Sequence, residues 1–176
     1  MCIRDSREGF AVHGIDVSPA AIGIARDRIA HENAGIPAPA PDLRVGNFSR
    51  LPWPDAHFDV AVDIFALYAN TKDVIRATLS EIARVLKPGA LFYSKLWGTG
   101  CTGYGLGRQL EPGTFDDIPG GPCKGMGVSH FFTREEIGPL FGTWFDATAI
   151  DTVQRTDVAA NQRIEEFHCQ FTRAAR

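Results

Sequence analysis

The sequence lacks the cysteine spacing of a metal site. It has four cysteines among 176 residues, and no two of them form a Cys-x-x-Cys pair. Because structural zinc sites draw their ligands from closely spaced pairs, we expect no metal centre. Scattered cysteines without a secretory leader are typical of reduced thiols, so we expect a cytoplasmic protein.

Long apolar runs and an excess of positive charge are missing as well. No apolar stretch reaches the length of a membrane span, so we expect no membrane partner. The formal net charge of −3 argues against a nucleic-acid partner, because phosphate backbones bind basic surfaces. Hydrophobic residues make up 44% and charged residues 22% of the chain, as in ordinary globular proteins. At this length we expect one domain.

Strand and helix patterns alternate from residue 10 onward. The apolar run from Phe10 to Asp16 predicts a strand buried on both faces. Ser18 and Pro19 predict a helix start, because the serine can cap free N–H groups and proline needs no donor at the first helical position. The apolar stripe of this helix is Ile22, Ala25 and Ile29.

Three further strands and a second helix are expected before residue 98. A proline- and glycine-rich loop is predicted over residues 34–41. The strands are predicted at residues 42–45, 58–63 and 90–97. A helix is predicted to begin near Thr71 and to be stopped by Lys87, Pro88 and Gly89. This alternation predicts an α/β fold with a mostly parallel sheet covered by helices.

The region from about residue 98 to 130 has a different character. Ten of the eighteen glycines lie between residues 98 and 127, and neither a helical nor a strand period is visible. We therefore expect a long lid or insert without regular structure. Gly98, Gly100 and Gly103 match the glycines of a dinucleotide fingerprint, but more glycine and proline follow in place of the required helix. A nicotinamide-dependent dehydrogenase is disfavoured for that reason.

Regular structure is expected to resume at residue 133. Thr133 and Glu136 form a capping box that opens a short helix. Two strands are predicted at residues 147–153 and 164–172. In the second strand we expect Phe167, Cys169 and Phe171 on a buried face, and Glu166, His168 and Gln170 on a wetter one.

Polar side chains are predicted at the ends of three successive strands. Ligands of open α/β sheets bind at these carboxyl ends. The Asp16 carboxylate can accept both hydroxyls of a ribose, and Asn47 with the Phe48 backbone N–H can bond an adenine edge. Asp63 would face the same crevice, lined by Ile64. The alternatives are a helix-start carboxylate for Asp16, a turn residue for Asn47 and a strand end for Asp63.

These segments together resemble the class I S-adenosylmethionine-dependent methyltransferases of the small-molecule type. The matching segments are Gly14 to Pro19, Gly46 to Trp53, Phe58 to Val60, and Ile82 to Gly89. The resemblance covers residues 10–97 and implies a Rossmann-like sheet of seven strands whose last strand runs antiparallel. It also implies S-adenosyl-L-methionine as cofactor and a small-molecule acceptor with an O, N, S or C nucleophile. The implied cofactor-binding residues are Asp16, Val17, Asn47, Phe48, Asp63 and Ile64.

The chain departs from the family pattern in two respects. The first strand and the glycine-rich turn that should precede Phe10 are missing, so we interpret residues 1–9 as a non-native or truncated lead and residues 10–176 as the methyltransferase domain. Asn47 stands where the family often has aspartate. The absent strand would be central, which leaves its neighbours with unpaired backbone groups and predicts marginal stability and weak cofactor binding for this polypeptide alone.

Two questions of function stay open at this point. One alternative is a non-catalytic scaffold or partner subunit that lacks the cofactor loop. The catalytic base, if the reaction needs one, is unknown. His130 is a weak candidate, because a lone histidine before a helix is more often structural.

Overall fold

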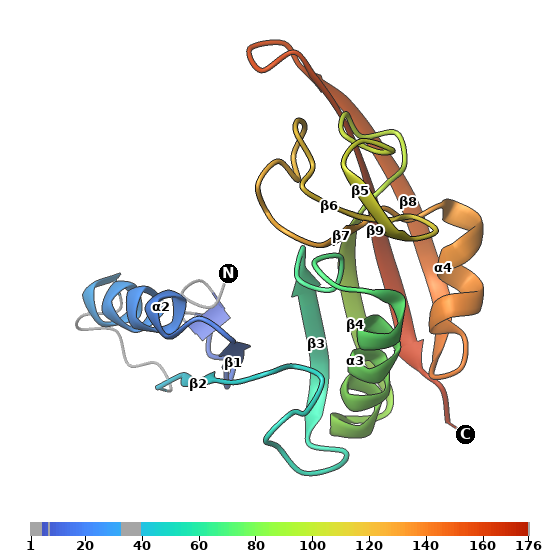
Figure 1. Ribbon diagram of the computed structural model, residues 1–176. Coiled ribbons are helices and arrows are strands. Elements are labelled where there is room, and N and C mark those ends of the chain that lie inside the picture. The colour runs from blue at the N-terminus through green and yellow to red at the C-terminus, as the bar shows by residue number, and fades with distance from the viewer. Residues whose placement is uncertain (1–4, 7, 33–39, 176) are drawn as a thin grey trace. The chain divides into compact units, whose positions relative to one another are not determined.

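The computed structural model describes residues 5–6, 8–32 and 40–175 of the chain (Figure 1). They belong to two compact units, Met1–Leu51 and Pro52–Arg176, which we describe separately. The lead expected over residues 1–9 and the loop expected over 34–41 lie partly outside the described residues. None of the described helices combines the length and apolarity that a membrane span requires.

The first unit contains a β–α–β motif. Its elements are β1 (His13–Asp16), α2 (Pro19–Glu32) and β2 (Asp42–Val45), and the two strands pair in parallel. Ile22 and Ile29 of the helix pack with Leu43 of β2, as the predicted apolar stripe requires. The prediction that the first strand is buried on both faces is wrong, since none of its residues is fully buried. Within this unit β1 has one strand neighbour and one helix beside it.

The second unit is built on a four-stranded mixed sheet. Its strands are β3 (Phe58–Ile64), β4 (Leu86–Trp97), β8 (Phe145–Asp157) and β9 (Gln162–Arg173), in the spatial order β3-β4-β9-β8. β3 and β4 run parallel, whereas β9 is antiparallel to both β4 and β8. The predicted α/β fold with an antiparallel last strand is confirmed.

Helices α3 (Lys72–Val85) and α4 (Arg134–Phe141) lie on one face of this sheet (Figure 1). The α3 side chains Ile75 and Leu79 are fully buried. Phe141 of α4 stacks on Phe171 of β9 with ring centroids 4.7 Å apart, and Phe171 pairs in register with Phe92 of β4. The apolar face predicted for the last strand is therefore confirmed: Phe167, Cys169 and Phe171 are all buried.

The other face of β3 and β4 is exposed. Val60 and Val62 of β3 and Leu91 of β4 are 51%, 45% and 53% exposed, and Val60 pairs in register with Leu91. Within the described part of the chain, β3 pairs with β4 alone and β1 pairs with β2 alone. Each therefore has one edge without a strand partner among the described residues.

The predicted separation between α3 and the following strand is wrong. The helix ends at Val85 and the chain becomes extended at Leu86, so Pro88 and Gly89 lie inside β4. Phe58 pairs with Leu86 and Val60 pairs with Leu91, so the residues between them bulge out of the ladder. A bulge tolerates proline, which has no N–H to donate, and Gly89 adopts the left-handed conformation with a φ of 76°.

The expected absence of regular structure between residues 98 and 130 is also wrong. This segment forms a small antiparallel sheet, which we call the insert sheet, with strands β5 (Arg108–Glu111), β6 (Thr114–Asp116) and β7 (Ser129–His130). Such short strands offer too few residues to show an alternating pattern. Gly113, with a φ of 85°, makes the turn between β5 and β6.

One residue of β9 departs from the predicted wet face. Glu166 is buried, with 7% of its surface exposed. Its carboxylate lies 2.9 Å from His168 Nε2, 3.6 Å from Arg155 Nη2 and 3.8 Å from Lys95 Nζ. Side chains from β8, β9 and β4 cover the Glu166 carboxylate, which a pattern within one strand does not reveal.

Candidate functional site

Asp16 is the last residue of β1 and its side chain is exposed. Its Oδ1 accepts a hydrogen bond from the Ser18 backbone N–H at 2.8 Å, and Ser18 Oγ accepts one from Ala21 N–H at 3.2 Å. Both bonds define the start of α2 as predicted from Ser18 and Pro19. Val17, between these residues, is 62% exposed.

Asn47 follows β2 at the same edge of the first unit. The two strand ends are joined by a hydrogen bond from Gly46 N–H to Asp16 O of 2.9 Å. Asn47 Oδ1 accepts from both the backbone N–H and the hydroxyl of Ser49, at 2.8 and 2.9 Å. The side-chain oxygen therefore stabilises the turn, while the half-buried Phe48 follows it. Asp16 and Asn47 therefore lie at neighbouring strand ends, as the sequence predicted.

Asp63 lies near the end of β3 with its carboxylate buried on the helix-covered side of the sheet. Oδ1 accepts from Ala66 N–H and Leu67 N–H at 2.9 and 3.2 Å, and Oδ2 accepts from Ser94 Oγ at 2.6 Å. Burial raises the pKa of this carboxyl, although the three hydrogen bonds oppose the rise. Ile64, the next residue, is 40% exposed, as strand alternation requires.

An aromatic cluster follows the ends of β3 and β4. Phe65 stacks on Trp97 with ring centroids 3.9 Å apart and planes inclined by 13°. Tyr68 meets both rings edge-on, at 6.4 and 6.1 Å. Phe65 has a φ of 57°, which is rare for an aromatic residue, and no sequence pattern predicted it. Trp53 is buried and lies outside this cluster, edge-on to Phe58 with ring centroids 5.3 Å apart.

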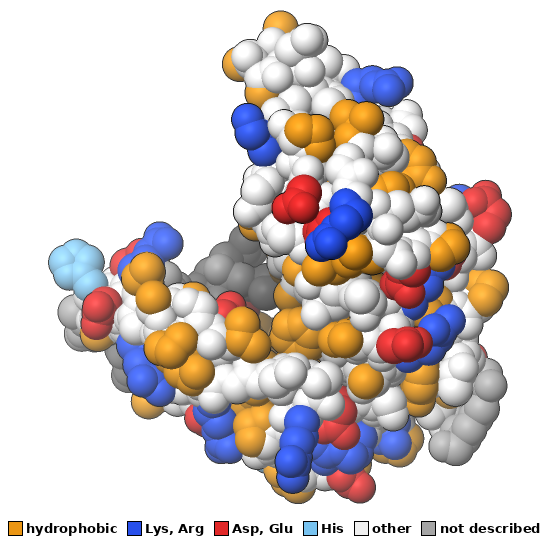
Figure 2. Space-filling model, in the orientation of Figure 1, with side chains coloured by type: hydrophobic (Ala, Val, Ile, Leu, Met, Phe, Trp, Pro, Cys, Tyr) orange, Lys and Arg blue, Asp and Glu red, His pale blue; other side chains and the backbone are white. Residues whose placement is uncertain are grey.

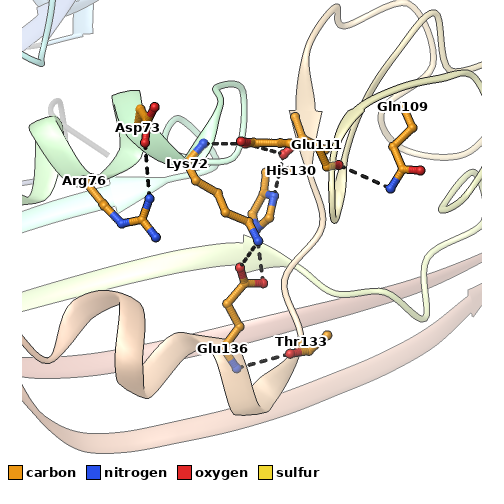
Figure 3. Close-up of polar contacts among 9 residues, drawn as sticks. Lys72, Asp73, Arg76, Gln109, Glu111, His130, Thr133 and Glu136 are labelled. Atoms are coloured by element: carbon orange, nitrogen blue, oxygen red, sulfur yellow. Dashed lines mark hydrogen bonds and ion pairs between the residues drawn. The ribbon is translucent and has the colours of Figure 1, made fainter.

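His130 belongs to a closed set of hydrogen bonds, which we call the polar ring (Figure 3). Lys72 backbone N–H and Thr114 Oγ1 both donate to Glu111 Oε1, at 2.7 and 2.9 Å. His130 Nδ1 lies 2.8 Å from Thr114 Oγ1, and its Nε2 lies 3.2 Å from Glu136 Oε2. Glu136 Oε1 closes the ring with Lys72 Nζ at 2.7 Å.

Both nitrogens of the His130 imidazole are thus engaged within the protein, and the side chain is completely buried. Thr133 Oγ1 accepts from Glu136 N–H at 3.2 Å, so the predicted helix cap is confirmed, but the Glu136 carboxylate turns into the polar ring. Burial alone would raise the pKa of the Glu136 carboxyl. The hydrogen bonds and charges of His130 and Lys72 outweigh burial and lower this pKa to about 2.

Sequence reasoning missed Lys72, Glu111 and Thr114. Lys72 and Glu111 are 39 positions apart and Thr114 and His130 are 16 apart, so no local spacing links them. The insert sheet and the start of α3 bring them together in the folded chain.

Comparison with known proteins identifies the family. Residues 2–89 match the family described as "Methyltransferase domain". This match spans half of the 176 residues, and the chain belongs to that methyltransferase family. Its fold is that of the S-adenosylmethionine-dependent methyltransferases, as the structural neighbour below shows.

Three similar proteins illustrate the relationship. The ubiquinone/menaquinone biosynthesis C-methyltransferase UbiE of Laribacter hongkongensis is 36% identical over 87 residues, which are 47% of this chain and 32% of that protein. The tRNA N(3)-cytidine methyltransferase METTL2 of Gallus gallus is 26% identical over 141 residues, 76% of this chain and 35% of that protein. A crystal structure of a SAM-dependent methyltransferase from Methanosarcina mazei superimposes with a TM-score of 0.75 at 24% identity, covering 99% of this chain and 87% of the other. The chain spans about a third of the length of these curated relatives.

Proposed function

We propose that this chain is part of an enzyme that transfers a methyl group from S-adenosyl-L-methionine to a small-molecule acceptor. The position of Asp16 carries the proposal: an exposed carboxylate ends a parallel strand directly before a helix. Ligands of α/β sheets bind at such ends. Each carboxylate oxygen has two lone pairs, so the bond from Ser18 leaves Asp16 able to accept both hydroxyls of the cofactor ribose.

The adenine contact is assigned to Phe48 and to the amide nitrogen of Asn47. Both lone pairs of Asn47 Oδ1 are used by Ser49, so this oxygen does not accept from an adenine amino group. The Asn47 amide hydrogens and the Phe48 backbone N–H remain donors for ring nitrogens of adenine. Val17 lies exposed beside Asp16 and offers apolar surface to the same ligand.

The bound cofactor supplies an electrophilic methyl group, which an O, N, S or C atom of the acceptor attacks in line. The protein contributes alignment and exclusion of water. In the second unit, Ile64 and Phe65 at the end of β3 offer partly exposed apolar surface for this purpose. We assign Asp63 and His130 to positioning roles, because the hydrogen bonds of their side chains lie within the protein.

A small molecule is the acceptor class that the chain favours over a nucleic acid. The named substrates of its relatives include both quinones and a tRNA. The net charge here is −3, and Lys and Arg side chains are interspersed with Asp and Glu on the face seen in Figure 2. A polyanion needs a continuous basic surface.

Equilibrium titration with S-adenosylhomocysteine tests the proposal on the full-length protein. Asp16→Asn keeps an oxygen for the Ser18 N–H but removes the charge, so we expect binding to weaken about ten- to a hundredfold. Asp27→Asn, at an exposed position of α2 in the same unit, is the matched control and should leave affinity unchanged. Equal affinities for both variants would contradict the role of Asp16.

A non-catalytic scaffold is the second candidate. It is favoured by one observation: two of the three polar residues at strand ends, Asn47 and Asp63, have their side-chain oxygens occupied within the chain. The same titration separates the candidates. If the full-length protein fails to bind S-adenosylhomocysteine at millimolar concentration, the scaffold is supported and the enzyme is rejected.

A further inference from the structure

The polar ring is the connection through which the insert sheet meets two helices (Figure 3). Glu111 comes from β5, Thr114 from β6 and His130 from β7, whereas Lys72 begins α3 and Glu136 lies in the first turn of α4. Thr114 and His130 are completely buried. Buried polar groups need partners, so breaking one bond here exposes its neighbours to a desolvation penalty.

The direction of each hydrogen bond fixes the protons on the His130 ring. Glu111 Oε1 accepts from Lys72 N–H, so it also acts as the acceptor for Thr114, whose hydroxyl proton is then used. Thr114 Oγ1 must accept from His130, which requires a hydrogen on Nδ1.

The second nitrogen needs a hydrogen for the same kind of reason. The Glu136 carboxylate is ion-paired with the Lys72 ammonium at 2.7 Å, and an ionised carboxylate only accepts. The 3.2 Å contact with His130 Nε2 therefore requires a hydrogen on Nε2. A ring that donates from both nitrogens is an imidazolium.

The charges of the polar ring agree with this assignment. The Glu111 and Glu136 carboxylates balance the Lys72 ammonium and a charged His130. A neutral imidazole would leave one uncompensated negative charge around a buried site, which is unfavourable. The charged groups of the polar ring around His130 are Glu136 on α4, Lys72 on α3 and Glu111 on β5. β6 presents the uncharged Thr114, and the chain just after β7 presents the Phe132 ring at 4.5 Å.

We propose that His130 is a buried imidazolium and that it acts as a proton-dependent latch holding the insert sheet to α3 and α4. Loss of one proton to solvent removes a donor, so either the bond to Thr114 or the bond to Glu136 breaks. The insert sheet is then held less firmly as the pH rises. The latch lies beside the aromatic cluster, since His130 N–H donates to Tyr68 O at 2.7 Å and Phe132 N–H donates to Trp97 O at 2.8 Å. This inference does not depend on the proposed methyl transfer.

Nitrogen-15 NMR of the imidazole side chains of the chain tests the protonation state directly. His130→Gln assigns the signal among the five histidines. We expect both His130 nitrogens to carry hydrogens at the acidic end of the folded range and to split into a protonated and an unprotonated nitrogen as the pH rises. A neutral tautomer at every pH at which the chain is folded overturns the proposal.

Amide hydrogen exchange tests the latch. The reporters are Phe131 N–H, which donates to Gly113 O, and His130 N–H, which donates to Tyr68 O. Once corrected for intrinsic exchange, their protection should fall about ten- to a hundredfold across the His130 titration. His57→Gln, an exposed position of the same unit, should show the same fall as the unaltered chain, whereas His130→Gln should show low protection at every pH.

Constant protection across the titration of the unaltered chain overturns the latch even if the imidazolium is found. If His130→Gln does not fold, the assignment can come from through-bond correlations to the backbone. Both decisive measurements then rest on the unaltered chain alone.

Discussion

Phe65 lies flat on Trp97, with ring centroids 3.9 Å apart, while its own backbone adopts a φ of 57°. This left-handed conformation costs about 1 kcal/mol or more for a residue with a Cβ. Asp63 holds the turn in place by accepting the N–H groups of Ala66 and Leu67, directly after Phe65. Such strain persists only where surrounding contacts hold it, and here the stack on Trp97 and the two hydrogen bonds to Asp63 supply those contacts.

The strain at Phe65 predicts an unusual order of stability. Phe65→Ala and Phe65→Gly both remove the ring, but only glycine relieves the left-handed backbone. We therefore expect the glycine variant to be more stable than the alanine variant by about 1 kcal/mol, although glycine normally lowers stability. Urea unfolding of the two variants measures the difference. A more stable alanine variant would show that the positive φ is not adopted.

The buried Asp63 predicts a contribution to the free energy of unfolding whose pH dependence has the opposite sign to that of most carboxylates. Burial raises its pKa above the ordinary 3.8, so its contribution to stability is full below that value and is lost as the pH rises through the raised pKa. Asp63→Asn keeps an oxygen for Ala66 N–H and Leu67 N–H and stays neutral. We expect this variant to lose that part of the pH dependence and to match the original chain at neutral pH within about 1 kcal/mol.

Asp63→Ala is the contrasting change. It leaves two backbone donors and the Ser94 hydroxyl without their acceptor, so we expect a loss of about 3 kcal/mol in the free energy of unfolding. Equal effects of the asparagine and alanine variants would mean that the hydrogen bonds to Asp63 contribute nothing.

The hydrogen bonds of Arg84 predict that Arg84→Lys lowers the free energy of unfolding more than Arg76→Lys does. Its guanidinium donates to both oxygens of Glu81 at 2.8 Å, and also to Trp53 O and Asp55 Oδ1, so it holds the segment before β3 against α3. Lysine cannot reproduce this fork, and we expect Arg84→Lys to lower the free energy of unfolding by about 1 kcal/mol. Arg76→Lys, in an exposed pair with Asp73, should change it by less than about 0.5 kcal/mol.

The fold was predictable where a signal lies within one element. Ser18 and Thr133 cap their helices as the sequence indicated, and the alternation of Phe167, Cys169 and Phe171 placed the buried face of β9 correctly. These features depend on residues two to four positions apart. Because these caps and this alternation depend on interactions within one element, a local sequence pattern is enough to predict them.

The missed features depend on partners that are far apart in the sequence. Pro88 and Gly89 predicted the end of a helix and a break before the next strand. In the structure they lie in a bulge of β4, between the residues that pair with Phe58 and Val60 of β3. At the candidate site, Asp16 could be placed from the β–α–β pattern alone, whereas the orientation of Asp63 depends on Ser94, 31 positions away. The environment of His130 required the whole polar ring, which no single segment encodes.

Glu136 predicts how the second unit responds to acid. Its folded-state pKa of about 2 lies below the ordinary 4.5, so the contribution of this carboxylate is full above pH 4.5 and is lost as the pH falls toward 2. Because the side chain is partly exposed, we expect that contribution to be about 2 kcal/mol. Glu136→Gln should remove it, and the stability difference from the original chain should shrink between pH 4.5 and 2. Glu135→Gln, at an exposed position in the same helical turn, is the control and should leave the acid response unchanged, as followed by urea unfolding at each pH. A constant difference between Glu136→Gln and the original chain over this range would show that the charge of Glu136 does not stabilise the fold.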